Sequence, residues 1–154
     1  MKITKKAFLI FISTLMHVFQ PITVLANTST VVISKEYLSD GSYFETVIES
    51  NDALRSTIKN ASKTTTYKNA DGNALWYAKV TANFYFDGKT SSCTSASASG
   101  EAYVDTWKIQ SKSSSRTGNV GSATVIAGCY FAGINIGNVS QTVTLACDKN
   151  GNLS

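Results

Sequence analysis

Residues 74–87 read ALWYAKVTANFYFD, and this stretch decides the fold. Its odd positions mix leucine and tyrosine with lysine, threonine, asparagine and aspartate, whereas every even position is apolar. The apolar set is Ala74, Trp76, Ala78, Val80, Ala82, Phe84 and Phe86. Because successive side chains of a strand point to opposite faces, this period of two predicts a β-strand with one face in the core.

Turn-forming residues bound this strand on both sides. The cluster at 69–73 (NADGN) and the Asp87-Gly88 pair supply residues that tolerate positive φ in hairpin turns. The serine-rich run 111–119 (SKSSSRTGN) is interpreted as a short low-complexity segment that ends in another turn. Further strands are predicted at 63–68, at about 103–111, at about 120–131 and at 134–147.

The last predicted strand changes the phase of its apolar residues. They are even at its start and odd toward its end: Ile134 and Ile136, then Val139, Val143 and Leu145. Gly137-Asn138 sits at the change, and a β-bulge there would restore the register. The hairpin that leads into this strand is expected at Ala132-Gly133.

Several strands with turn signals between them, and no amphipathic helix after residue 26, predict an all-β protein. Alternation of apolar and polar residues, with one face exposed to solvent, is typical of antiparallel strands. Parallel strands are buried on both faces and have continuous apolar runs instead. We therefore expect an antiparallel β-sandwich, with an Ig-like arrangement or a small barrel as the alternatives.

The first 26 residues have the pattern of a secretory signal peptide. Lys2, Lys5 and Lys6 precede the apolar run 7–16, and Val24-Leu25-Ala26 fits a signal-peptidase site. We expect cleavage after Ala26 and a secreted product without stable membrane insertion, because the apolar run is too short to cross roughly 30 Å of hydrocarbon.

The rest of the chain divides into two parts. Residues 27–58 hold two short strand signals around the turn cluster 39–42 but lack sustained periodicity. We interpret them as an N-terminal arm of uncertain order, and residues 59–154 as the β-sandwich domain.

The charge gives no case for nucleic acid or an anionic membrane as a partner. Three of the fourteen Lys and Arg lie before residue 27, so eleven remain against ten Asp and Glu, a net charge of about +1. Those cations are scattered singly among Ser, Thr and Asn, whereas nucleic-acid binding needs a basic stripe.

Composition argues against most catalytic chemistries. The only histidine, His17, lies in the expected signal peptide, so His-dependent triads and the usual zinc sites are absent from the secreted chain. Two acid pairs, Glu45 with Glu49 and Asp87 with Glu101, have the residue types of a glycosidase. Scattered acids are more often solvated, so we expect neither an enzyme nor a cofactor.

The sequence Asp148-Lys149-Asn150-Gly151-Asn152 is rich in oxygen ligands but does not match a calcium loop. Its glycine is misplaced and no glutamate follows. We interpret it as a terminal turn, and we expect no metal site.

The polar face of the long strand is the candidate binding face. Leu75, Tyr77 and Tyr85 flank Lys79 and Asn83, and flat rings beside hydrogen-bonding groups suit a sugar or protein ligand. The structural alternative is that these tyrosines only pack on neighbouring strands or on the N-terminal arm.

Several segments together resemble a family of small secreted proteins from Firmicutes that has no established function. They are residues 37–49, 68–76, 93–94, 107–109, 143–147 and 150–154. The resemblance implies a secreted β protein and offers no site.

The sequence alone permits three pairings among Cys93, Cys129 and Cys147. Cys129 and Cys147 would oppose one another if the last turn lay at Gly137-Asn138. The resemblance implies instead that Cys93 and Cys147 form the disulfide, with Cys129 particular to this chain.

Two functions follow as hypotheses. The first is a non-enzymatic secreted protein that binds cell-wall polysaccharide or an extracellular protein. The second is a secreted carboxylate-dependent hydrolase or antimicrobial effector.

Overall fold

The computed structural model describes residues 27–52 and 57–154. The expected signal peptide and its cleavage position lie outside the described residues. Eight strands follow one another in the chain: β1 (Asn27–Tyr37), β2 (Tyr43–Asp52), β3 (Ile58–Lys68), β4 (Ala74–Phe86), β5 (Ser91–Ala102), β6 (Trp107–Thr117), β7 (Val120–Phe131) and β8 (Ile134–Ala146).

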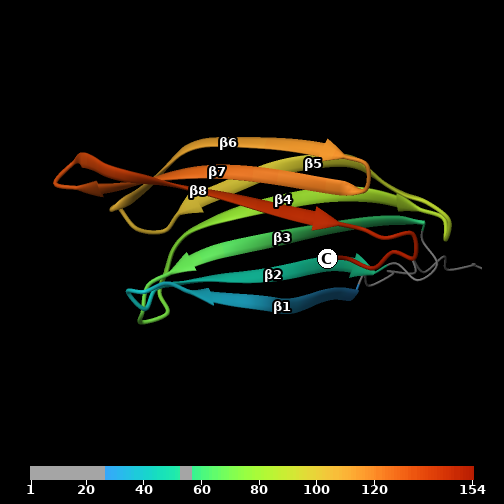
Figure 1. Ribbon diagram of the computed structural model, residues 1–154, viewed down its shortest axis with the longest axis horizontal. Coiled ribbons are helices and arrows are strands. Elements are labelled where there is room, and N and C mark those ends of the chain that lie inside the picture. Colours follow the sequence, from blue (N-terminus) through green and yellow to red (C-terminus); the bar gives the residue numbers. More distant parts are fainter. Residues whose placement is uncertain (1–26, 53–56) are drawn as a thin grey trace, which may run out of the picture.

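The protein is an all-β antiparallel sandwich of two meanders (Figure 1). One sheet has the order β1-β2-β3-β4-β5 and the other the order β6-β7-β8, and every neighbouring pair is antiparallel. Consecutive pairing differs from the Greek-key connections of an Ig-like fold. Among the described residues no helix is long and apolar enough to cross a membrane.

The predicted core strand is confirmed. The even positions of β4 from Trp76 to Phe84 are buried against the smaller sheet, whose inward side chains are also small or aliphatic. These partners are Ala123, Val125 and Ala127 on β7 and Val143 and Leu145 on β8. A Cβ on Gly121 would lie 3.0 Å from the Ala82 Cβ, so small residues let the two sheets approach closely.

An aromatic cluster closes one end of the core. The ring centroid of Trp76 lies 6.2 Å from that of Phe44, 6.1 Å from that of Tyr67 and 5.9 Å from that of Trp107. These rings come from β2, β3, β4 and β6, so the cluster joins the larger sheet to the edge of the smaller one.

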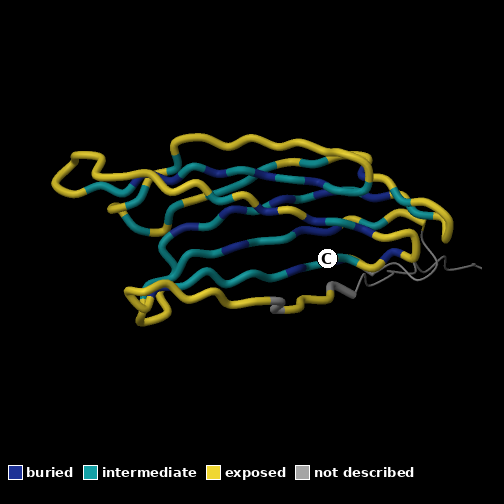
Figure 2. Tube along the Cα trace, viewed as in Figure 1, coloured by how far each residue is buried: buried dark blue, intermediate teal, exposed yellow. Residues whose placement is uncertain are grey.

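The serine-rich run, interpreted as a low-complexity segment, forms most of a strand, and the turn predicted at its end is present at Gly118 and Asn119. β6 extends from Trp107 to Thr117, later than the predicted 103–111, and pairs with β7 along its length. Its side chains are mostly exposed (Figure 2), so no apolar periodicity marks it. Ser114 Oγ donates to the Ala96 carbonyl and Arg116 to the Cys93 carbonyl, which caps the open edge of β5.

The segment interpreted as an arm supplies β1 and β2 to the larger sheet. The two strands extend this sheet beyond the smaller one, so their inner face has no second layer of strands over it (Figure 1). That position explains the weak apolar periodicity. The turn at 38–42 follows the sequence expectation, with Gly41 at φ 84° and the Asp40 carboxylate accepting from the Ser42 backbone N–H.

The β7–β8 hairpin turns at Ala132 and Gly133, as predicted, with φ of 47° and 80°. The bulge predicted in β8 is present one residue earlier: Gly137 opposes Cys129 and Asn135 opposes Tyr130, so Ile136 is the extra residue. The bulge accounts for the change of apolar phase along the strand.

Candidate functional site

The candidate binding residues of β4 lie mainly on the face of the larger sheet that points away from the smaller one. Tyr77, Lys79 and Asn83 are half-buried there and Tyr85 is exposed. Their neighbours Trp76, Ala78, Val80, Ala82 and Phe84 point into the core. The outer face is therefore built by the same alternation that builds the core.

Leu75 differs from this expectation. Tyr67 pairs with Trp76 and Lys68 with Ala74, so Leu75 is the extra residue of a bulge. Its side chain is half-buried and packs against the core. The bulge breaks the period of two at this end of β4, which removes Leu75 from the binding face.

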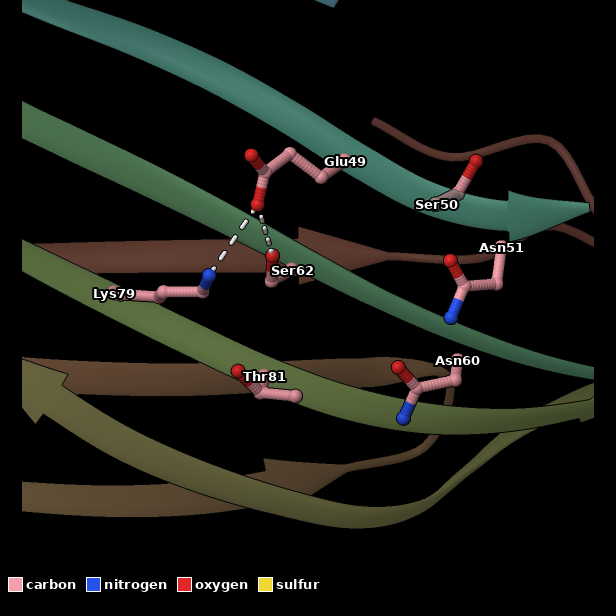
Figure 3. Close-up of a pocket in the computed structure, with 7 residues that line it drawn as sticks. All are labelled: Glu49, Ser50, Asn51, Asn60, Ser62, Lys79 and Thr81. Atoms are coloured by element: carbon pink, nitrogen blue, oxygen red, sulfur yellow. Dashed lines mark hydrogen bonds and ion pairs between the residues drawn. The ribbon is translucent and has the colours of Figure 1, made fainter. Parts of the chain in front are cut away.

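A polar hollow lies in the middle of the outer face (Figure 3). Its volume is about 190 Å³, below the roughly 300–1,000 Å³ of pockets that enclose drug-sized ligands. The residues that line it are Glu49, Ser50, Asn51, Asn60, Ser62, Lys79 and Thr81. Cross-strand register brings them together, since Glu49 pairs with Ser62 and Ser62 with Thr81.

Glu49 organises one side of the hollow. Its Oε2 accepts from Ser62 Oγ at 3.2 Å and lies 3.3 Å from the Lys79 Nζ. Figure 3 shows both contacts, with the carboxylate pointing toward the lysine and the hydroxyl. The Glu49 and Lys79 side chains are 43% and 30% exposed, so both charges are accessible to a ligand.

A chain of amide and hydroxyl groups continues from the hollow across three strands. Asn60 Nδ2 donates to Asn83 Oδ1 at 2.6 Å, and Asn83 Nδ2 donates to Ser95 Oγ at 2.9 Å. These bonds run from β3 through β4 to β5. The network fixes the orientation of the amides before any ligand arrives.

Tyrosine rings mark both ends of the face. Tyr77 packs beside Tyr103 with ring centroids 5.7 Å apart, and Tyr103 is 55% exposed. Tyr85 is 42% exposed near the other end of β4. The eight-residue interval between Tyr77 and Tyr85 corresponds to about 26 Å along a strand. The face thus suits an extended ligand better than a compact one.

Comparison with known proteins adds no further assignment. The chain matches no family model, no curated protein and no solved structure. The function must therefore be argued from the site itself.

The two acid pairs are not brought together. Glu45 and Glu49 lie four residues apart on one face of β2, about 13 Å along a strand. Glu45 contacts Lys68 at 2.5 Å and Lys35 at 3.1 Å, and hydrogen bonds from Lys68 and then Lys35 lower its pKa. A general acid of a glycosidase needs a raised pKa instead.

The second acid pair lies at opposite ends of the larger sheet. Asp87 follows β4 at the end where Phe86 pairs with Ser91, whereas Glu101 pairs with Tyr77. Backbone hydrogen bonds from Thr90 and then Lys89 lower the pKa of Asp87. Its carboxylate therefore stabilises the turn between β4 and β5 by accepting these hydrogen bonds.

The sequence Asp148-Lys149-Asn150-Gly151-Asn152 forms the predicted turn. Asp148 Oδ1 accepts from the backbone N–H groups of Asn150 and Asn152, and Asp148 Oδ2 accepts from Asn152 Nδ2. Gly151 has φ 85°. Within residues 27–52 and 57–154, no cluster of three or more His, Cys, Asp or Glu could hold a metal ion.

All three cysteines are thiols in this structure. The Cys93 backbone N–H donates to the Gly118 carbonyl at 2.8 Å, and the Cys147 backbone N–H donates to the adjacent Asn119 carbonyl at 3.1 Å. The two buried cysteines thus flank the same turn between β6 and β7. Burial raises the pKa of both thiols.

Cys129 lies far from that turn. It pairs with Trp107 and Gly137. The residue before Cys147, Ala146, pairs with Val120, which is nine residues from Cys129 along β7. Nine residues of strand span about 30 Å. Because the hairpin turns at Ala132-Gly133, Cys129 does not oppose Cys147.

Sequence reasoning found the β4 residues of the site and missed those that face them from β2 and β3. Asn51, Asn60 and Ser62 carry no local signal, because polar residues on a strand are ordinary surface. Their role depends on cross-strand register, which no single segment encodes.

Proposed function

We propose that the protein binds an extended, hydroxyl-rich polymer, such as a cell-wall polysaccharide, along the outer face of its five-stranded sheet. The observation that carries this proposal is the hollow around Glu49, Ser62 and Lys79, continued by the Asn60–Asn83–Ser95 chain and flanked by tyrosines. Binding without catalysis fits the distance between the two acids within each candidate pair, since neither pair is brought together.

The chemistry of the face matches that of a saccharide. Each sugar hydroxyl both donates and accepts, and amides and hydroxyls offer both functions, while Lys79 only donates and Glu49 only accepts. Tyrosine rings supply flat apolar area at low entropy cost. The small, open hollow would take one unit of a polymer whose neighbouring units lie on the surrounding strands.

The same composition argues against an extracellular protein as the partner. The centre of a protein interface is depleted of charged residues and enriched in large aromatic anchors. Here the centre holds the Glu49–Lys79 ion pair and short polar side chains, and the rings lie toward the ends.

Retention on immobilised polymers tests the proposal. The secreted chain is passed over peptidoglycan and common polysaccharides, and we expect retention on at least one of them. Lys79→Met with Asn83→Ala should weaken that retention roughly tenfold or more, because two hydrogen-bonding groups at the centre of the face are lost.

Lys112→Met is the matched control for that variant. Lys112 is exposed on β6, so its substitution makes the same change of charge on the other sheet. Equal retention of the site variant and the control, or no retention on any polymer, would contradict the proposal.

We further propose that the product is exported and processed after Ala26. The apolar run behind Lys2, Lys5 and Lys6 and the Val24-Leu25-Ala26 site support this proposal. The intact mass of the secreted protein should correspond to a chain that begins at Asn27. A product that retains Met1 would refute the processing.

The disulfide between Cys93 and Cys147 also stays a proposal. It is supported by the resemblance and by the position of both residues at the turn between β6 and β7. Its formation removes two protons and two electrons from the thiols, which an extracellular thiol oxidoreductase or oxygen would accept.

A further inference from the structure

The β7–β8 hairpin carries exposed apolar side chains that the fold does not use. Phe131, Ile134 and Ile136 are 74%, 68% and 64% exposed. The turn itself needs only the positive φ of Ala132 and Gly133, so polar flanking residues would form it equally well. Large apolar side chains gathered at one exposed place mark an interaction surface.

The hairpin extends the molecule along its longest axis. In Figure 1 it reaches beyond the other loops of the same end, those that follow β1, β3 and β5. Figure 2 shows that the hairpin is exposed at its tip and along the first part of β8. The apolar residues therefore form a narrow, convex tip instead of a groove.

The sheet behind the tip is basic. Residues 107–147 contain Lys108, Lys112 and Arg116 and no acidic residue. The charge count over the whole chain did not reveal this local excess, so the sequence expectation of no attraction to an anionic membrane does not hold for the smaller sheet. Lys108 lies at the base of the hairpin, with its Nζ 4.8 Å from the centre of the Tyr130 ring. The acidic residues of this end lie on strands of the larger sheet and in the connections after β1, β3 and β5, and Asp105 of the last connection lines the same hollow as Lys108.

Polar groups surround the base of the hairpin on the outer face of the smaller sheet. Gln110 Nε2 donates to the Tyr130 hydroxyl at 2.8 Å, and Asn135 Nδ2 donates to Asn138 Oδ1 at 2.9 Å. From tip to base the order is thus apolar side chains, then a tyrosine with amides and a lysine. The same order runs from the acyl region of a bilayer to its headgroups, where tyrosine and lysine are favoured.

We propose that the β7–β8 hairpin docks the protein reversibly on an anionic lipid bilayer, with Phe131, Ile134 and Ile136 at the boundary between headgroups and acyl chains. A tip two strands wide offers far less than the roughly 800 Å² that each partner buries in a stable protein interface. A bilayer needs no complementary surface, and its binding strength combines buried apolar area with attraction between cations and anionic lipids.

Co-sedimentation of the processed chain with vesicles tests this proposal. One vesicle type is phosphatidylcholine alone and the other has equal parts of phosphatidylcholine and phosphatidylglycerol. We expect binding to the mixed vesicles, and a loss of roughly tenfold or more in F131S/I134S/I136S because the apolar contribution is removed. Lys108→Gln should weaken binding to the mixed vesicles only.

Val31→Ser with Ile58→Ser is the control, since these residues are 56% and 62% exposed on the other sheet. Phe131→Trp adds a measure of depth: its emission should shift to the blue and be quenched by brominated acyl chains. Retention on polysaccharide should not change in the tip variant, which separates this proposal from the proposed function.

Three results would overturn the proposal. They are no binding of the unaltered chain to mixed vesicles, equal binding of the tip variant and the control, and a tip variant that dissolves a dimer in the absence of lipid. The last result would identify a second copy of the chain as the partner.

Discussion

Trp76→Ala is expected to lower the free energy of unfolding by about 3 to 5 kcal/mol. Trp76 is fully buried and packs against Phe44, Tyr67 and Trp107. Its removal leaves a cavity where β2, β3, β4 and β6 meet, and strands on both sheets would have to shift to fill it. The midpoint of urea denaturation, with its slope, measures the loss.

Two further variants test the explanation of that loss. The Trp76 Nε1 has no hydrogen-bond partner among the described residues, so the side chain contributes through packing. Trp76→Phe should therefore cost much less than Trp76→Ala. Ile58→Ala, at a position that is 62% exposed, should change stability by less than about 0.5 kcal/mol. An unchanged midpoint for Trp76→Ala would contradict the assignment of the core face.

The proposed disulfide between Cys93 and Cys147 is expected to contribute roughly 2 to 4 kcal/mol of stability. It would tie β5 of the larger sheet to the chain just after β8 of the smaller one, and so restrict the unfolded chain. We expect reductant to lower the denaturation midpoint of the unaltered chain, and to do the same in Cys129→Ser, which keeps the bridge.

Peptide mapping of the unreduced protein decides the pairing. A single linked peptide pair that contains Cys93 and Cys147 is the expected result, with Cys129 free. Three free thiols would show that the proposed disulfide does not form. A linked pair that contains Cys129 would conflict with the fold, because Cys129 lies nine residues of β7, or roughly 30 Å, from Val120, where β7 begins after the turn at Gly118.

The sequence predicted the parts of the fold in which side-chain period and burial agree. Residues 76–86 alternate strictly because one face meets the smaller sheet and the other meets solvent. The Ala132-Gly133 turn and the bulge in β8 were predictable for a similar reason: positive φ favours particular residues, and an extra residue reverses the apolar phase.

β6 and β1 could not be predicted with the same ease. β6 lies at an edge with nearly all its side chains exposed, so its stability comes from backbone pairing with β7 and contacts to the edge of β5. β1 and β2 extend the larger sheet past the smaller one. Although β2 contributes Phe44 and Ile48 to the core, they are too few to give a clear period of two.

In the site, too, residues of one strand could be predicted from the sequence, whereas contacts between strands could not. Tyr77, Lys79, Asn83 and Tyr85 share a face because they belong to one strand, which the alternation reveals. The contribution of Glu49 depends on its pairing with Ser62, and this register joins strands from distant parts of the sequence.

Chemical-shift mapping by NMR is the most direct test of the proposed binding face. A soluble fragment of a polysaccharide that retains the protein is titrated into the isotope-labelled chain that begins at Asn27. The account predicts shifts concentrated at Glu49, Ser62, Lys79 and Asn83, with the smaller sheet unperturbed. Shifts confined to β6–β8, or spread evenly over both sheets, would contradict it.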